Sequence, residues 1–507
     1  MWHGLPRHSP RPKCPRAWGI HVREGRVQSK MHRMKAALVA SWLADSTPIS
    51  ASDFEPWRVH SLLQRRWVSA FDIGGRLGIG ALKTEWDTAA CPSGRVALPP
   101  GMSTTSSPDP FNTLVEALDL PPVKDGPLNG TRFTVKDNID IAGHRTSFGS
   151  LAWRDTHPAP VHNALCVDQL LAAGAHCVGK AVADEFTYSL DGESQFFGTP
   201  QNAKAPGRVP GGSSSGSAAS VANGLADFSI GTDSGGSVRV PASLCGIWGM
   251  RPSLHRISEA GVLPFMPSVS TVGILAASLP LLEAVARVLL HSQTTPVTAP
   301  RRLLVLSDAV ELALPAVQQQ LRAALDEIAR RTGLVAEPIR FAELVGEDAA
   351  LSDCNLKALR DLQTAEFQST VGNWIEATRP ELGATFTLAY GNVQHFDRIA
   401  ALESLARSER LFEQINAALP PGTIICFPTA PTVAPLKGSL DTLEAVTAFY
   451  DPTMTLTAFS GVARLPEISA PLLTAEGCPV GMSFAAGHYQ DESLLMALSE
   501  MLGPQGS

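Results

Sequence analysis

Residues 211–242 read GGSSSGSAASVANGLADFSIGTDSGGSVRVPA, with two glycine- and serine-rich loops separated by apolar segments. The first loop, residues 211–217, leads into an expected helix over Ala218–Asn223. An expected strand over Asp227–Gly231 runs into the second loop, residues 232–237. A flexible linker would not alternate with apolar segments that need burial, so this stretch predicts a packed α/β core.

Each loop places a serine directly after two glycines, Ser213 in the first and Ser237 in the second. Glycine pairs adopt conformations that expose consecutive backbone N–H groups. A serine beside such donors can be a nucleophile with an oxyanion hole, or it can belong to a structural turn. A phosphate-binding loop is excluded, since no Gly-Lys-Ser/Thr follows the glycines and no Gly-x-Gly-x-x-Gly opens a helix.

The stretch resembles the signature of the amidase signature family of serine hydrolases, in which Gly-Gly-Ser-Ser is followed by Gly-Thr-Asp-x-Gly-Gly-Ser-x-Arg-x-Pro-Ala. Ser213 and Ser237 lie 24 residues apart, as in that family. The upstream segment Val-Lys-Asp-Asn supplies the family's lysine, which is Lys136 here. The resemblance covers roughly 110–500. It implies a single large α/β/α domain with a mixed β-sheet covered by helices on both faces.

The resemblance implies a Ser–Ser–Lys triad, with Ser237 as nucleophile, Ser213 as proton relay and Lys136 as base. Ser213 would follow a cis peptide bond from Gly212. None of the 13 histidines lies within the signature, and a lysine serves as base only if burial lowers its pKa from about 10.4. The other expected site residues are the oxyanion-hole N–H groups of Ser234, Gly235, Gly236 and Ser237, and the supporting residues Ser214, Asp233 and Arg239. Arg239 is expected to hold the loop. No metal and no cofactor is expected.

The substrate class is implied by a narrower resemblance. The runs 227–247 and 188–193 are similar to those of indole-3-acetamide hydrolases and their bacterial relatives. This implies a small primary amide, with an aryl or indolyl acid as one form. The alternatives are a glutaminase-type subunit of a tRNA-dependent amidotransferase and a non-catalytic binding protein of the same fold. The segment after Pro252 lacks the Tyr-Gly-x-Val-Ser-Arg-Tyr-Gly pattern of those glutaminase subunits.

Composition restricts the partners. The chain is 44% hydrophobic and 18% charged with a net charge of −7, which does not favour nucleic acid. No apolar run reaches the roughly 18 residues of a membrane span. The eight cysteines form no Cys-x-x-Cys pair, which indicates a reducing, cytoplasmic setting. The expected partners are a small amide substrate and, in a homodimer, a second copy of the chain.

Residues 1–101 differ from the remainder, with 15 Lys and Arg against 7 Asp and Glu. This N-terminal extension has no recognisable fold. It can be a targeting or regulatory segment, or it can precede a true start at Met102. The amidase domain is expected over 102–507.

Further elements are expected along the chain: helices over Phe111–Leu118, Leu275–Leu290 and Asp491–Met501, strands over Thr131–Lys136 and Thr423–Phe427, and mostly helical pocket walls over 355–415. The adjacent Asp184 and Glu185 are interpreted as structural or hydrogen-bonding residues, because consecutive side chains usually diverge. Many relatives have glycine at the position of His255, which leaves the shape of that loop open.

Overall fold

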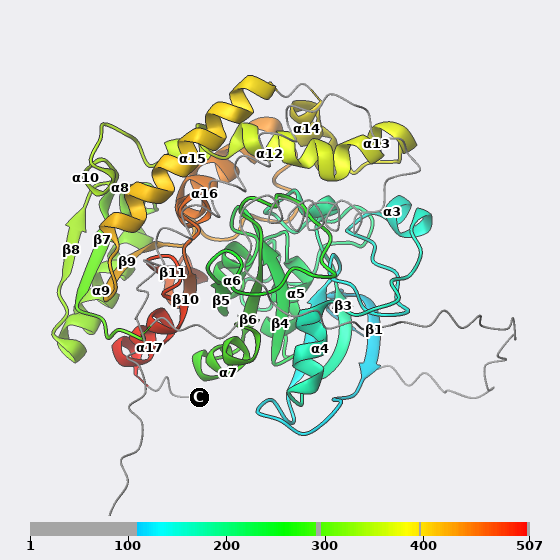
Figure 1. The fold of residues 1–507 in the computed structure, drawn as a ribbon, viewed down its shortest axis with the longest axis horizontal. Coiled ribbons are helices and arrows are strands. Elements are labelled where there is room, and N and C mark those ends of the chain that lie inside the picture. The colour runs from blue at the N-terminus through cyan, green and yellow to red at the C-terminus, as the bar shows by residue number, and fades with distance from the viewer. Residues whose placement is uncertain (1–108, 291–295, 395–396, 504–507) are drawn as a thin grey trace, which may run out of the picture. The chain divides into compact units, whose positions relative to one another are not determined.

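The computed structural model describes residues 109–290, 296–394 and 397–503 (Figure 1). The extension over 1–101 and the candidate start at Met102 lie outside these residues. The strands are β1 (Leu114–Leu120), β2 (Arg132–Lys136), β3 (His176–Ala181), β4 (Phe228–Asp233), β5 (Trp248–Arg251), β6 (Thr271–Ala276), β7 (Arg302–Leu306), β8 (Ala336–Ile339), β9 (Thr423–Pro428), β10 (Glu467–Ala475) and β11 (Cys478–Ala486).

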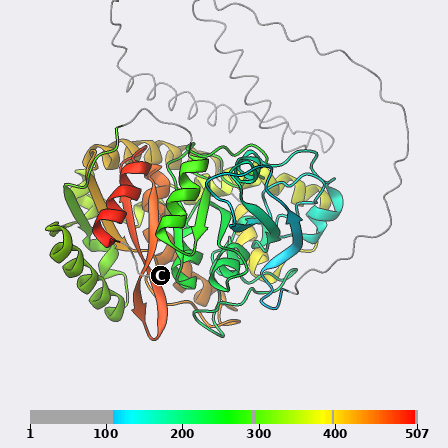
Figure 2. The same cartoon turned by 90° about the horizontal axis from the view of Figure 1, so that it is seen from below.

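These strands form one sheet of eleven, in the order β1-β3-β2-β4-β6-β5-β10-β11-β9-β7-β8. β2 runs parallel to β3 and β4, and β7 runs parallel to β8 and β9. The other neighbours are antiparallel. Figure 2 shows β10 and β11 as a long hairpin near the closing helix α17 (Asp491–Leu502). The predicted mixed sheet is confirmed.

Helices cover both faces of the sheet. The principal ones are α3 (Leu151–Thr156), α4 (Leu165–Ala172), α5 (Ser215–Ala222), α6 (Arg239–Cys245), α7 (Leu279–Leu289), α9 (Pro315–Thr332), α12 (Arg360–Phe367), α14 (Ala384–Val393), α15 (Arg398–Ala418) and α16 (Leu443–Ala463). Shorter ones are η2 (Glu185–Thr187), α8 (Ser307–Glu311), α10 (Phe341–Val345), α11 (Asp353–Leu356), η3 (Gln368–Gly372) and α13 (Asn373–Thr378).

Strand β6 shows how two faces are built from one alternating pattern. Val272 and Ile274 belong to the large core with α7, whereas Leu275 belongs to a separate cluster with residues of α5 and α6. Successive side chains of a strand point to opposite faces, so each face of the sheet packs against its own set of helices. The expected helix from Leu275 is therefore wrong at its start. The strand continues to Ala276, and Ser278 caps α7 by accepting the N–H of Leu281.

The same alternation orients the lysine. Phe133 and Val135 of β2 point into the large core. Thr134 and Lys136 therefore point to the opposite face, toward α5. The Thr134 hydroxyl lies 2.8 Å from the Ser220 hydroxyl of that helix. The strand thus presents Lys136 to the signature loops.

The expected helix over Phe111–Leu118 is wrong, because this segment contributes to the edge strand β1. Leu114 and Leu118 have helical spacing, but Leu118 and Leu120 also fit a strand. Asp109 accepts the N–H groups of Phe111 and Leu114 and holds the turn before the strand. The open edge of β3 then supplies a hydrogen-bonding partner that a sequence pattern does not reveal.

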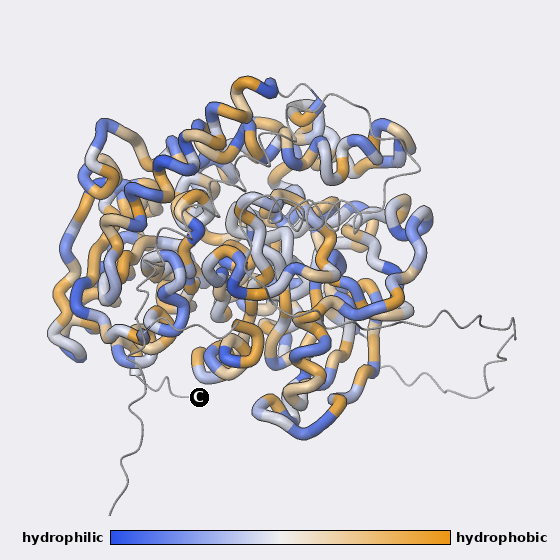
Figure 3. The backbone as a smooth tube through the Cα atoms, viewed as in Figure 1, coloured by the Kyte–Doolittle hydropathy of each residue, from blue (hydrophilic) through white to orange (hydrophobic). Residues whose placement is uncertain are grey.

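The described part of the region 355–415, which leaves out 395–396, is mostly helical, as predicted. Helix α15 begins at an N-cap, Asp397, whose carboxylate accepts the N–H groups of Ile399 and Ala400. Its tube in Figure 3 mixes hydrophobic and hydrophilic residues along its length, and buried residues such as Leu405, Ser408 and Leu411 recur every three to four positions, the pattern of a helix with one buried face. His255 adopts a φ of 68°, a conformation that favours glycine, which agrees with the expected glycine in relatives.

Candidate active site

Lys136 is fully buried at the end of β2. Its Nζ lies 2.9 Å from the Ser213 hydroxyl and 2.9 Å from the Thr232 hydroxyl. Burial lowers the pKa of Lys136 to about 7, although the carboxylates of Asp184 and Asp233 oppose the shift. A large fraction of this amine is therefore neutral near pH 7 and can accept a proton.

The first loop places Ser213 against this amine. The peptide bond between Gly212 and Ser213 is cis, as the resemblance implied. A Cβ on Gly212 would lie 1.8 Å from a carboxylate oxygen of Asp184, so a side chain does not fit there. The N–H of Asp184 donates to the carbonyl of Ser213 at 3.2 Å. Asp184 is thus a hydrogen-bonding residue behind the loop, as its position beside Glu185 suggested.

The second loop is joined to the first through Ser214. The N–H of Ser214 donates to the carbonyl of Ser237 at 3.2 Å, and its hydroxyl donates to the carbonyl of Thr232 at 3.3 Å. In the described part of the chain, no hydrogen bond joins the hydroxyls of Ser213 and Ser237 directly. The structure therefore pairs Lys136 with Ser213 by side chains, and brings Ser237 beside them by backbone.

The four expected oxyanion-hole residues differ in orientation. Gly235 and Ser237 line a cavity. The N–H of Gly236 instead donates to a carboxylate oxygen of Asp233 at 3.1 Å, and the Ser234 hydroxyl pairs with that of Ser270. Because Asp233 accepts the Gly236 N–H, Gly235 and Ser237 are the expected oxyanion-hole residues that line the cavity and whose N–H groups remain candidates for this role.

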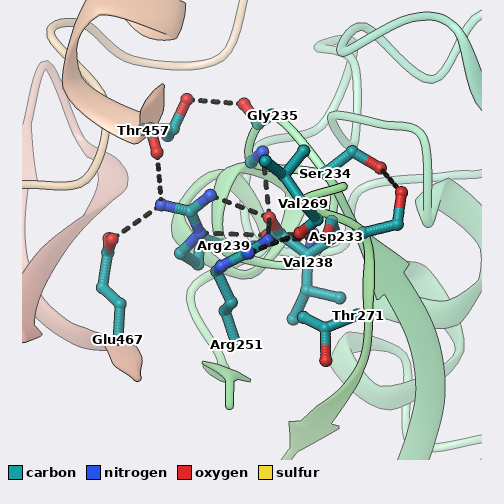
Figure 4. A network of polar contacts seen from close by, with 12 residues as sticks. Asp233, Ser234, Gly235, Val238, Arg239, Arg251, Val269, Thr271, Thr457 and Glu467 are labelled. Atoms are coloured by element: carbon teal, nitrogen blue, oxygen red, sulfur yellow. Dashed lines mark hydrogen bonds and ion pairs between the residues drawn. The ribbon is translucent and has the colours of Figure 1, made fainter. Parts of the chain in front are cut away.

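A buried ionic network supports the second loop (Figure 4). Arg239 donates to both carboxylate oxygens of Asp233, at 3.0 and 2.8 Å, and to Glu467 at 2.6 Å. Arg251 donates to the carbonyl of Asp233 at 2.7 Å and to the carbonyl of Val269 at 2.5 Å. Burial alone would raise the pKa of Asp233, but the two guanidinium groups hold it well below its ordinary value. Asp233 therefore stays ionised and fixes the loop.

Two residues of the site were not predicted as such. Thr232 accepts a hydrogen bond from Lys136, and the side-chain amide of Asn138 donates to the same hydroxyl at 3.2 Å. Both residues belong to the quoted motifs, Thr232 to Gly-Thr-Asp and Asn138 to Val-Lys-Asp-Asn. Their positions in those motifs were the available signal.

The cavity in front of Ser237 has a volume of about 910 Å³. Aromatic side chains on its wall come from four separate segments: Tyr188, Phe265, Phe386 and Tyr450. Tyr188 follows two residues with left-handed backbone, Phe186 (φ 47°) and Thr187 (φ 57°), a rare conformation for such side chains. This turn places Glu185, Thr187, Tyr188 and Ser189 along the wall. The predicted pocket walls over 355–415 contribute Phe386 and the α12 residue Arg360.

Three further features of the described residues concern metal ligands, cysteines and membrane spans. Among the described residues, no group of three or more His, Cys, Asp or Glu side chains is arranged to hold a metal ion. The six described cysteines are buried and unpaired. No helix within 109–290, 296–394 or 397–503 is long and apolar enough to cross a membrane.

Comparison with known proteins identifies the family of this chain. A model of the Amidase family matches residues 116–327 and 335–495. A solved structure described as an amidase superposes with a TM-score of 0.64 at 25% identity, covering 74% of this chain and 85% of that one. Fold and family together define an amide-hydrolysing enzyme of the α/β class. The chain belongs to the amidase signature family.

Two curated relatives match over nearly their whole length. Amidase 1 of Oryza sativa subsp. japonica is 32% identical over 411 residues, which cover 76% of this chain and 92% of the relative. A glutamyl-tRNA(Gln) amidotransferase subunit of Halobacterium salinarum is 31% identical over 425 residues, which cover 76% of this chain and 98% of the relative.

Proposed function

We propose that this protein hydrolyses the C–N bond of a small primary amide to a carboxylic acid and ammonia through the triad Lys136, Ser213 and Ser237. The observation that carries the proposal is the buried contact of 2.9 Å between the Lys136 amine and the Ser213 hydroxyl. A buried amine with a pKa near 7 is able to activate a hydroxyl at neutral pH.

In this mechanism the Ser237 hydroxyl attacks the amide carbonyl carbon. Its proton passes to Ser213, whose own proton passes to the Lys136 amine. The N–H groups of Gly235 and Ser237 stabilise the oxyanion. Collapse of the tetrahedral intermediate breaks the C–N bond, and the proton on Lys136 returns through Ser213 to the leaving ammonia. Water then attacks the acyl-enzyme by the same relay and releases the acid and the Ser237 hydroxyl.

The acyl group of the substrate is proposed to be aromatic, with an indolyl acid as one form. Tyr188, Phe265 and Phe386 on the cavity wall favour a flat apolar group. A cavity of about 910 Å³ is large enough for a ligand of this size.

The second candidate function is that of a glutaminase subunit in a tRNA-dependent amidotransferase. The Halobacterium salinarum relative, covered over 98% of its length, favours it. The two candidates differ in a measurable way, because a glutaminase subunit needs its partner subunits. A non-catalytic binding protein is disfavoured by the contact between Lys136 and Ser213.

The test is ammonia release from indole-3-acetamide, benzamide, propionamide and glutamine by the full chain and by its Ser237→Ala variant. Turnover of simple amides by the chain alone, lost in Ser237→Ala, is the expected result. Equal activity of the variant contradicts the mechanism. Turnover of glutamine only, and only with the other amidotransferase subunits present, identifies the second candidate.

We also infer a cytoplasmic location and a homodimer. The buried, unpaired cysteines favour a reducing compartment. Light scattering on the full chain measures the molar mass in solution. A mass of one chain contradicts the homodimer.

A further inference from the structure

The cavity in front of Ser237 has an unbalanced charge. Arg360 is the one Lys or Arg among its described lining residues, and this guanidinium lies 2.9 Å from a carboxylate oxygen of Asp451. An excess of carboxylates in a low-dielectric cleft concentrates cations there. The carboxylates that line the cavity are Glu185, Asp191, Glu193, Asp361, Asp397, Asp441 and Asp451.

One of these carboxylates, Glu185, is only 9% exposed and lacks a full set of partners. Its Oε2 accepts the N–H of Gly383 at 2.9 Å. Its Oε1 has less than 1 Å² of accessible surface and no hydrogen-bond partner among the described residues. Burial raises the pKa of Glu185 to about 7. A buried carboxylate that lacks a partner is costly, and a positive charge in the adjoining cavity would lower that cost through space.

Other members of the wall have their own partners. Asp191 accepts the Tyr450 hydroxyl at 2.7 Å, and Glu193 accepts the N–H of Gly438 at 2.9 Å. The excess negative charge of the wall therefore includes carboxylates that have hydrogen-bond partners, whereas Glu185 has one oxygen atom without a partner.

Glu185 is tied to the catalytic loop. It follows Asp184, which packs against Gly212, and it lines the same cavity as Ser237. The aromatic side chains of Tyr188 and Phe265 lie on the wall of that cavity. Aromatic faces attract cations that approach them, so aromatic and acidic groups here favour the same kind of ligand.

We propose that the substrate is an amide whose acyl part carries a positive charge, such as an ammonium group, and that Glu185 is its counter-ion. The proposal rests on the function proposed above and adds the charge of the substrate. Glu185 acts in recognition, and the bond-making steps stay with the triad.

The first measurement compares three primary amides of similar size that differ in charge: 4-(aminomethyl)benzamide, 4-ethylbenzamide and 4-carbamoylbenzoate. The full chain is expected to show a kcat/KM at least about tenfold higher for the cationic amide than for the ethyl one, and to use the anionic amide least. An equal kcat/KM for the cationic and ethyl amides, or a preference for the anion, overturns the proposal.

Variants then assign the effect to one carboxylate. Glu185→Gln keeps an oxygen acceptor for Gly383 and removes the charge, so the ratio of kcat/KM between the cationic and ethyl amides is expected to fall toward one. Glu444→Gln is the charge-matched control, because Glu444 is exposed in the first turn of α16 and does not line the cavity. This control is expected to keep the wild-type ratio. A wild-type ratio in Glu185→Gln overturns the assignment.

A binding measurement separates this proposal from the proposed function. Calorimetry with Ser237→Ala records affinity for the same three amides without turnover. Tighter binding of the cationic amide supports the proposal even if the wild-type chain hydrolyses none of the three, a result that contradicts the proposed function alone. Equal affinity for all three overturns the proposal whatever the activity. The affinities of the three amides for Ser237→Ala test the charge preference of the cavity even if Glu185→Gln fails to fold.

Discussion

At the scale of single residues, the chemistry depends on one buried amine. The Lys136 amine would be a cation in water. Burial removes the water that solvates this positive charge and so lowers the pKa of the amine. The nearby carboxylates of Asp184 and Asp233 attract the proton back, so the resulting pKa of about 7 is a balance between opposing effects. This balance sets the pH at which a lysine can replace histidine as a base.

The first prediction concerns pH. The protonated amine cannot accept a proton, so kcat/KM for benzamide is expected to rise with pH through about 7 and then level off. At pH 6, one unit below that pKa, it should be about tenfold below the plateau. A neutral substrate is used so that the cavity carboxylates, Glu185 included, are not needed as counter-ions.

The check is initial rates from pH 5 to 9, with circular dichroism at each pH as the control for folding. A kcat/KM that stays constant between pH 6 and 9 contradicts Lys136 as the base.

The second prediction concerns the relay. Ser213→Ala removes the hydroxyl between the base and the nucleophile, and we expect kcat to fall by at least about 10²-fold. Thr134→Val is the matched control, since its hydroxyl lies on the same face of β2 but contacts Ser220 and Ser229. The control should keep most of its activity. A Ser213→Ala variant with wild-type kcat contradicts the relay.

At the scale of elements, the site is made where strand ends meet loops. Lys136 ends β2, and Asp233 ends the neighbouring parallel strand β4. The parallel register brings both ends to one edge, where α5 and α6 begin after the two loops. The backbone of the second loop is as important as its side chains, because its N–H groups at Gly236 and Val238 donate to Asp233 and its residues Gly235 and Ser237 line the cavity.

The third prediction concerns this backbone. Gly236 has a φ of 122°, and an added Cβ would lie 2.9–3.0 Å from the Thr457 side chain. Gly236→Ala should shift the adjacent donors of Gly235 and Ser237 and lower kcat by about 10²–10³-fold. Gly130→Ala is the control, since Gly130 also has a positive φ (79°) but nothing lies within 4 Å of the added Cβ. Steady-state kinetics of both variants measure the difference. Equal losses in both would contradict the argument.

At the scale of the whole described chain, the network around Asp233 connects segments far apart in sequence. Arg239 of α6 joins β4 to Glu467 of β10 and to the carbonyl of Thr457 in α16. The residues on the cavity wall come from equally distant segments, from Glu185 to Met454. Loss of one partner would leave the remaining charges buried and unpaired.

The fourth prediction is that Arg239→Met lowers the free energy of unfolding by about 3–5 kcal/mol, because Asp233 and Glu467 lose a buried partner. Urea unfolding of the purified variant measures it. Arg302→Met is the control, since its partner Glu337 and Arg302 itself are about half exposed, and the effect there should be much smaller. Equal urea midpoints of unfolding for Arg239→Met and Arg302→Met would contradict the structural role of Arg239.

Local patterns in the sequence predicted a packed α/β core around residues 211–242, and the family resemblance carried by the motifs implied the mixed sheet and the three residues of the candidate triad. Those patterns are apolar alternation, glycine pairs and motifs at fixed spacing. Other features emerge only in the folded chain: the segment after Phe111 is an edge strand, Gly236 donates to Asp233, and Thr232 contacts Lys136. Glu185 likewise faces the same cavity as Ser237 only because of the tertiary fold. Each of these depends on a partner that is remote in sequence, such as the open edge of β3 or the wall formed by α14 and α16, and a local pattern carries no information about such a partner.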